Sequence, residues 1–213
     1  MMSHFKKAKL IDVMKHLGLF LLALILLGVM ALSHRSAGAT TPSDSSIKLE
    51  TLVPERVLTI PQNEPSNYTP IQFGVRITNN TLTAFRVSLD SLTPEFMAVD
   101  GENFYAGKIQ VSLVFRTESD FPLVRAGESL NLFWEGKFYW GAQNIYLQIP
   151  DKYSNLWFFR GFKPGISKVR FTYTNAEAQR WYRDREKAER KQLMGVLTGN
   201  LSSPWTQFSF VLP

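Results

Sequence analysis

The sequence contains no cysteine, and its three histidines, His4, His16 and His34, all lie near the N-terminus. A chain without cysteine forms no disulfide bonds, so its hydrophobic core has to stabilise the fold. If an N-terminal leader is removed, the remaining domain contains neither histidine nor cysteine. That composition excludes a serine–histidine–aspartate triad, a cysteine–histidine pair and a zinc site built from these ligands.

The first 39 residues have the composition of an export signal. A basic segment, residues 1–16, precedes the uncharged run 17–32, and the small residues Ala37-Gly38-Ala39 follow. At about 1.5 Å per residue, a hydrophobic helix over 17–32 would be about 24 Å long, shorter than the roughly 30 Å hydrocarbon core. We therefore expect a signal peptide that is cleaved before Thr40, or alternatively an uncleaved membrane anchor. In both cases the lysines stay in the cytoplasm and the domain lies outside it.

The excess of basic charge is concentrated in this leader. The chain carries a net charge of +6, and residues 1–39 account for +4 of it through five Lys or Arg residues and one Asp. Residues 40–213 therefore carry only +2, which gives little attraction for a phosphate backbone. We expect no nucleic-acid partner.

The rest of the chain has the pattern of a β domain. Residues 40–46, TTPSDSS, are polar and indicate a tether. From residue 47 onward, apolar and polar residues alternate, as in half-buried strands, between clusters of Pro, Gly, Asn and Asp. We expect strands within 47–60 and at 71–78, 84–89, 109–115, 130–134, 145–149, 156–159, 169–173 and 206–211.

One segment departs from this pattern. Residues 176–194, AEAQRWYRDREKAERKQLM, are strong helix formers without Gly or Pro, and Thr174 with Glu177 matches a capping box. We therefore predict an α-helix that is inserted in a C-terminal hairpin. The strands of that hairpin are residues 165–173 and 205–212.

The C-terminal part of the chain resembles bacterial extracytoplasmic immunoglobulin-like domains. A Pro164-Gly165 turn leads into the alternating stretch 168–175, and 205–212 looks like the strand that closes the sheet. The resemblance extends over residues 49–212 and implies an antiparallel β-sandwich. It implies no functional residues, because sandwiches of this class have many unrelated functions.

Aromatic side chains are the main indication of a binding surface. All five tryptophans fall between Trp134 and Trp205. Consecutive aromatic residues on a strand point to both faces, so either the helix or a loop covers the outer ones or they form an exposed platform. The candidate contact residues are Trp181, Tyr182, Arg183 and Arg185 on the expected helix, followed by Trp134 and Trp140.

Together these features favour an exported, non-enzymatic binding or structural module of the cell envelope that contacts a protein or an envelope component. We expect no cofactor and no metal, and membrane association would occur through residues 17–32. A carboxylate-dependent glycan hydrolase is one alternative, because paired Asp and Glu residues hydrolyse glycosides without histidine. An immunoglobulin-like protease inhibitor and a membrane-anchored structural subunit are the others.

The leader gives the first testable prediction. We expect the mature protein to begin at Thr40, because the small-residue triplet before it fits signal-peptide cleavage. Mass spectrometry of the protein from intact cells should therefore find an N-terminal peptide that starts at Thr40. A membrane-bound protein that retains the peptides of residues 1–16 would identify the uncleaved anchor instead.

Overall fold

The computed structural model describes residues 46–64, 66–109, 116–141, 143–152, 155–184, 187 and 189–213. The chain divides into two units, 1–40 and 41–213, and every described residue belongs to the second. The expected leader and all but the last residue of the expected tether lie outside the described residues. In the described part, no helix has the length and apolar character needed to cross a membrane.

The prediction of a mainly β domain is confirmed. The larger of two main sheets has the strand order β1-β3-β8-β9-β10-β6, and all of its neighbouring strands are antiparallel. Its strands are β1 (Ile47–Leu52), β3 (Tyr68–Asn79), β6 (Tyr105–Ile109), β8 (Ser129–Gly141), β9 (Asn144–Pro150) and β10 (Leu156–Phe162).

The second sheet is built around β11 (Gly165–Asn175). Strand β5 (Leu92–Ala98) pairs along one edge of β11, and β15 (Thr206–Val211) and β14 (Gly199–Ser202) pair in turn along the other. The short β2 (Val57–Thr59) runs parallel to β15. The expected pairing of residues 165–173 with 205–212 is confirmed for residues 165–169, which lie opposite 206–210, whereas Thr172 and Tyr173 pair with β14 instead.

A proline separates β14 from β15. Pro204 has no backbone N–H and so cannot continue the ladder. Ser203 compensates: its N–H donates to the carbonyl of Phe171 at 2.9 Å, and its hydroxyl accepts the N–H of Phe171 at 2.9 Å. The same hydroxyl is 2.6 Å from that of Thr51 on β1. Ser203 therefore links β11 of the second sheet to β1, the edge strand of the larger sheet.

Aromatic side chains fill the space between the two sheets. Phe96 of β5 lies with its ring centroid 5.1 Å from Phe73 of β3 and 4.6 Å from Phe159 of β10. Phe138 of β8 meets Phe210 of β15 at 4.6 Å and 90°. Edge-to-face pairs of this kind add to the stabilisation from apolar burial. Both sheets therefore share one core, to which β3, β9 and β11 contribute alternate residues.

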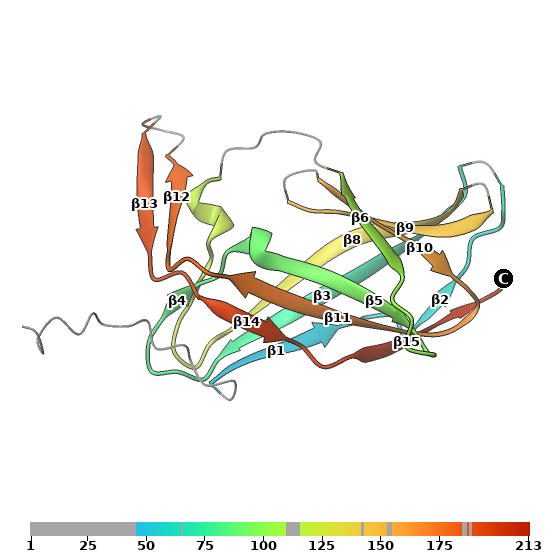
Figure 1. Cartoon of the computed structure of the whole chain (residues 1–213), viewed down its shortest axis with the longest axis horizontal. Helices are drawn as coiled ribbons and strands as arrows, with labels where there is room; N and C mark the ends of the chain where they lie inside the picture. The colour runs from blue at the N-terminus through green and yellow to red at the C-terminus, as the bar shows by residue number, and fades with distance from the viewer. Residues whose placement is uncertain are drawn as a thin grey trace, which may run out of the picture. The chain divides into compact units, whose positions relative to one another are not determined.

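The predicted helix over 176–194 is wrong. This segment contains an antiparallel hairpin of β12 (Gln179–Arg183) and β13 (Arg190–Met194), which Figure 1 shows at one end of the sheets. Tyr182 and Leu193 pack there with Phe121 and Val196 in a second, small cluster. The helix propensity of the segment is worth only tenths of a kcal/mol per residue, so the packing of these side chains decides the conformation.

Other boundaries also differ from the expected ones. The strand expected at 84–89 is shorter: β4 (Phe85–Arg86) pairs with β7 (Leu123–Val124), and 3₁₀ turns occur at Leu89–Ser91 and Glu118–Asp120. Strand β5 was not expected, because Pro94 disrupts its sequence pattern. A proline is tolerated in a strand that lies at the edge of a sheet. Most of the strand expected at 109–115 lies outside the described residues.

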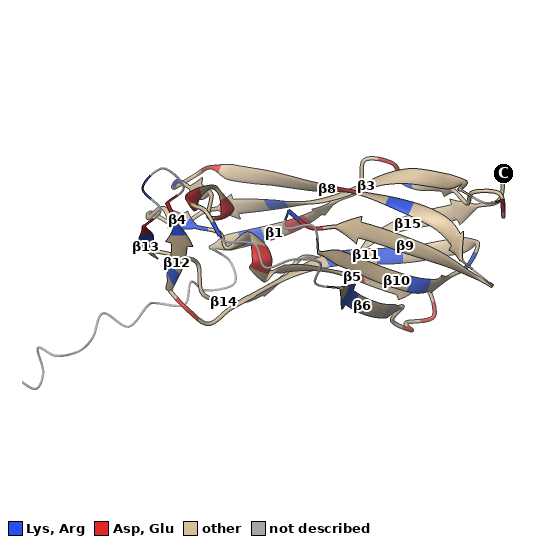
Figure 2. Ribbon diagram, turned by 90° about the horizontal axis from the view of Figure 1, so that it is seen from above, with Lys and Arg blue, Asp and Glu red and all other residues tan. Residues whose placement is uncertain are grey.

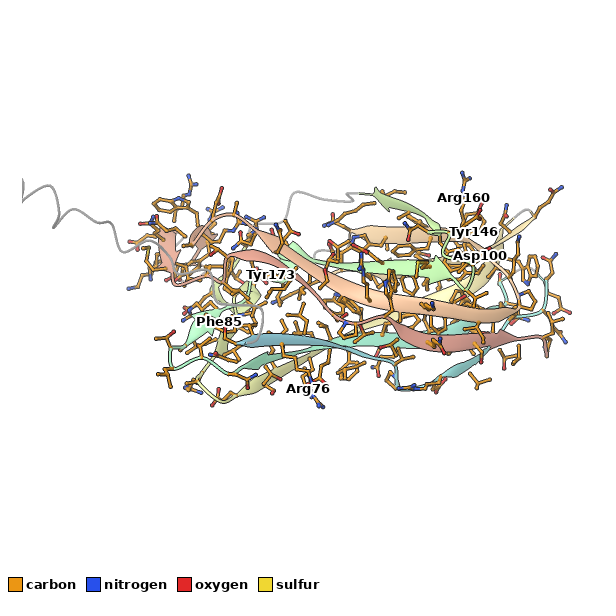
Figure 3. All side chains as sticks on the ribbon, turned by 60° about the horizontal axis from the view of Figure 1, so that its bottom comes forward. Arg76, Phe85, Asp100, Tyr146, Arg160 and Tyr173 are labelled. Carbon is orange, nitrogen blue, oxygen red and sulfur yellow. The ribbon has the colours of Figure 1, made fainter. Side chains whose placement is uncertain are left out.

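Tyr173 ties the hairpin to the second sheet. Its side chain is fully buried, and its hydroxyl donates to the carbonyl of Leu197 at 2.8 Å. Asn175 donates to the same carbonyl at 2.6 Å, so both lone pairs of that oxygen are used. Leu197 follows β13 closely, and the two bonds therefore fix the base of the hairpin. Figure 3 shows Tyr173 at the same end of the domain as Phe85.

The burial of Tyr173 predicts a loss of stability at alkaline pH. Burial raises the pKa of Tyr173 from 10.0 to about 12. The unfolded chain therefore loses this proton at a lower pH than the folded chain does. Tyr173 contributes fully to the free energy of unfolding below pH 10, and this contribution is lost as the pH rises to 12. The loss should approach about 2–3 kcal/mol.

Denaturant unfolding of the wild type and Tyr173→Phe over this pH range isolates the effect. Below pH 10 the wild type should be more stable by about 1 kcal/mol, the value of a typical hydrogen bond. That advantage should shrink and then reverse as the pH approaches 12. A difference between the two proteins that does not change with pH would contradict the raised pKa.

Candidate functional site

The hairpin presents one face with all of its side chains directed away from the core. In the register of the two strands, Gln179 lies opposite Met194, Trp181 opposite Gln192, and Arg183 opposite Arg190. All six are exposed, and Trp181 and Met194 retain 48% and 58% of their accessible surface. We call these residues the hairpin face: Gln179, Trp181, Arg183, Arg190, Gln192 and Met194.

Contacts within the hairpin face hold its side chains in place. The guanidinium carbon of Arg190 lies 4.7 Å from the ring centroid of Trp181, a cation–π contact. Gln192 donates a hydrogen bond across the strands to the side chain of Gln179. The hairpin face contains two arginines and no acidic residue. It is therefore a positively charged surface with an ordered tryptophan at its centre.

The opposite side of the hairpin attaches it to the domain. Besides the cluster around Tyr182, the N–H of Arg183 donates to the carbonyl of Arg116 at 2.8 Å, and Arg180 forms an ion pair with Glu177 at 2.7 Å. Lys191 forms an ion pair with Asp184, and this hydrogen bond raises the pKa of Lys191. Figure 2 shows basic and acidic residues close together around β12, β13 and β4.

The structure separates the residues that the sequence suggested as contacts. Trp181 and Arg183 belong to the hairpin face, whereas Tyr182 points to the opposite side and is partly buried. Arg185 lies outside the described residues. Trp134 and Trp140 point inward: Trp134 stacks on Phe171 at 5.1 Å, and Trp140 donates its indole N–H to the carbonyl of Pro61 at 2.7 Å. Both are therefore partly buried and pack against the core.

Sequence reasoning missed a second surface, on the outer face of the larger sheet. Tyr68 of β3 lies opposite Tyr139 of β8, which in turn lies opposite Tyr146 of β9. The rings of Tyr139 and Tyr146 stack at 5.7 Å with 19° between their planes, and Tyr68 is 56% exposed. Burial, with a further contribution from Tyr146, raises the pKa of Tyr139. We call the three residues the tyrosine row.

The alternation of side chains along β8 could have predicted this surface from the sequence. Because successive side chains alternate between the faces of a strand, an inward Trp134 and Trp140 require an outward Phe133 and Tyr139. The composition of the segment identifies these aromatic residues as a group, but only the register of the strand assigns each of them to a face.

A groove adjoins the tyrosine row. It has a volume of about 770 Å³, and Tyr68 belongs to both features. The ammonium of Lys137, which also lines the groove, lies 5.9 Å from the ring centroid of Tyr68 and 5.7 Å from that of Tyr139. We call it the sheet groove; its lining is Pro54, Glu55, Tyr68, Pro70, Ile71, Gln72, Glu135, Gly136, Lys137, Gln148, Pro150 and Leu156.

The polar side chains of the sheet groove have unused hydrogen-bonding capacity. Within the described part of the chain, those of Gln72, Glu135 and Gln148 form no hydrogen bond or ion pair. A ligand in the groove would therefore meet two amides and a carboxylate without displacing existing bonds. Across the described ranges, no group of three or more His, Cys, Asp or Glu residues is placed to hold a metal ion.

Comparisons with known proteins assign neither a family nor a function to this chain. No family model matches the chain, and no curated protein matches it. Among solved structures, "X-ray structure of Northeast Structural Genomics Consortium target SoR45" is similar over 78% of this chain and 88% of that chain, with 11% sequence identity and a TM-score of 0.37. A similarity this low supports no conclusion about fold or function.

The two sides of the hairpin should respond differently to mutation. We expect Trp181→Ala to lower the free energy of unfolding by at most about 1 kcal/mol, because Trp181 is half-exposed and its main contact is the cation–π pair. Leu193→Ala should lower it by about 2 kcal/mol or more, because Leu193 is buried in the second cluster.

Denaturant unfolding of both variants tests this difference. If Leu193→Ala left the unfolding midpoint unchanged, the hairpin would not be part of the cooperative fold.

Proposed function

We propose that this protein is an exported, non-enzymatic binding module of the cell envelope that contacts a partner protein through the hairpin face. Its two sheets would form an immunoglobulin-like sandwich, and residues 1–39 would direct it out of the cytoplasm. The observation that carries the proposal is the hairpin face, an exposed surface centred on Trp181 and attached to the domain by a separate hydrophobic cluster.

The residue types of the hairpin face are those that protein interfaces favour. Trp, Met and Arg are enriched at the centres of interfaces, whereas Lys, Glu and Asp are depleted there. Trp181 has arginines beside it and Met194 on the same face. A tryptophan that enters a pocket of a partner often supplies much of the binding energy.

The charge of the hairpin face indicates the partner's chemistry. Arg183 and Arg190 give the face two positive charges, and no acidic residue belongs to it. A complementary partner would have an apolar pocket for Trp181 and carboxylates around its rim. Such pairing raises the rate of association and disfavours basic partners.

The attachment of the hairpin should also favour tight binding. The hydrogen bonds to the Leu197 carbonyl and the packing of Leu193 hold the hairpin in position before a partner arrives. A surface that is already ordered loses little conformational entropy on binding, so more of the contact energy contributes to affinity.

Site-specific photo-cross-linking in intact cells tests the proposal. A photo-reactive amino acid at position 181 should give one discrete protein adduct. The matched control is the same amino acid at Ile166, which is 49% exposed on β11 and outside the hairpin face. Arg183→Glu with Arg190→Glu, in the protein that carries the cross-linker at 181, should abolish the adduct by charge repulsion.

The purified partner then allows affinity to be measured. Trp181→Ala should weaken binding about 30-fold or more, which corresponds to about 2 kcal/mol for a central interface tryptophan. The same adduct from position 166, or an adduct that survives both charge reversals, would show that the hairpin face is not the contact surface.

A glycan hydrolase is the second candidate, because the carboxylates of Glu55 and Glu135 line the same groove. Two carboxylates flanking one bond are the usual machinery of glycoside hydrolysis. Release of reducing ends from a polysaccharide by the wild type, but not by Glu135→Gln, would establish this activity and overturn the non-enzymatic proposal.

A further inference from the structure

We propose that the sheet groove and the tyrosine row form a binding site for a neutral, β-1,4-linked polysaccharide chain. This site is separate from the hairpin face and does not depend on the proposed protein partner. The proposal rests on the aromatic surface of the row, the unused polar groups of the groove and the small charge of its lining.

The tyrosine row provides an aromatic surface for successive sugar rings: Tyr68 is 56% exposed, and beside it the partly buried rings of Tyr139 and Tyr146 stack on each other. Its three residues lie on three adjacent strands, and because strands are spaced about 4.8 Å apart, the row extends about 10 Å across the sheet. The C–H groups on the faces of a pyranose ring pack against aromatic rings. A β-1,4-linked chain is a flat, extended ribbon, so it can contact neighbouring rings with consecutive sugars while it lies across the strands.

Gly141 allows the ring of Tyr146 to lie close to the sheet. A Cβ atom at position 141 would approach Cε2 of Tyr146 to 2.8 Å and Cδ2 to 3.0 Å, closer than real Cβ contacts allow. Aromatic rings that cover a glycine on a neighbouring strand are a recognised means of stabilising a sheet. The Tyr146 ring is therefore held against β8 and is in position before a ligand binds.

The groove supplies hydrogen-bonding groups beside these rings. Gln72, Glu135 and Gln148 line it, and within the described residues their side chains have no hydrogen-bond partner. Each sugar hydroxyl both donates and accepts hydrogen bonds, as amides also do, and a carboxylate accepts them through both of its oxygens. Neighbouring hydroxyls of a sugar can therefore bond to one amide or carboxylate.

The same features disfavour other polymers. The charged lining residues are Glu55, Glu135 and Lys137, which give a net charge of −1 and do not attract phosphate. An extended peptide usually binds by adding to the edge of a sheet. Beneath the row, β8 already pairs with β3 and β9, and β9 pairs with β8 and β10, so their backbone groups are used.

The location of the site allows both surfaces to be occupied together. Figure 3 shows Tyr146 and Arg160 at the end of the sheets opposite Phe85 and Tyr173, the end where the hairpin is attached. In the register of β9 and β10, Arg160 lies directly opposite Tyr146. A glycan on the larger sheet would leave the hairpin face accessible to a protein.

Calorimetric titration of the full chain with chitohexaose and cellohexaose tests the proposal. At least one hexasaccharide should bind, and the corresponding monosaccharide should bind at least about tenfold more weakly, because it covers only one ring. Tyr139→Ala and Tyr146→Ala should each weaken binding by about tenfold. Tyr139→Phe keeps the ring and should retain most of the affinity.

Two further variants make the test specific. Gly141→Ala retains all three tyrosines but displaces the Tyr146 ring, so it should also weaken binding severalfold. The control Ile166→Ala, on the other sheet, should leave the affinity unchanged, and so should Trp181→Ala. Thermal unfolding of each variant identifies any that does not fold. The affinities of the folded ones among Tyr139→Ala, Tyr146→Ala and Gly141→Ala then decide whether the proposal holds.

The opposing results are equally definite. If neither hexasaccharide binds to the folded wild type, or if Tyr139→Ala, Tyr146→Ala and Gly141→Ala all bind as well as Ile166→Ala does, the proposal is wrong. A loss of binding in Trp181→Ala alone would place the glycan on the hairpin face. Because the cross-linking experiment at position 181 uses no sugar, failure of one proposal leaves the other intact.

Discussion

The packing of phenylalanine rings between the two sheets is the constraint on which the rest of the structure depends. Without disulfide bonds, this core holds the sheets together, and Phe96 contacts Phe73 and Phe159 from the opposite side. Every strand that supplies an inward side chain must direct the next one outward. The outward set includes the tyrosine row, so the position of a candidate binding surface follows from the requirements of the core.

The same alternation explains how much of this molecule was predictable. It located most of the long strands and the pairing of β11 with β15, because one buried face imposes a period of two. It failed at β5, where Pro94 breaks the pattern, and at residues 176–194, where helix propensity pointed the wrong way. The hairpin forms there because Tyr182 and Leu193 meet Phe121 and Val196, contacts between distant parts of the chain that no local pattern contains.

The candidate sites were predictable to a smaller extent. Trp181 and Arg183 were identified from composition and remain exposed, but on a strand rather than a helix. Trp134 was a candidate contact residue whose side of the sheet the sequence left open, and in the structure it stacks on Phe171. The side on which a tryptophan lies depends on the register of its strand, and register depends on pairing with residues far away in the sequence. Composition can therefore indicate that a surface exists before it can indicate which residues form it.

The proline in β5 has a consequence for how this protein behaves among many copies of itself. Within the described residues, Phe96 and Ala98 of β5 form backbone hydrogen bonds to Phe104 and Glu102 on the edge that faces away from β11. The first half of β5 has no such partner there, so its edge would be a template on which another chain could form hydrogen bonds. Pro94, near the middle of β5, lacks the N–H that a regular ladder needs. A second chain that approached this edge would lose part of its bonding, which makes edge-to-edge aggregation less favourable.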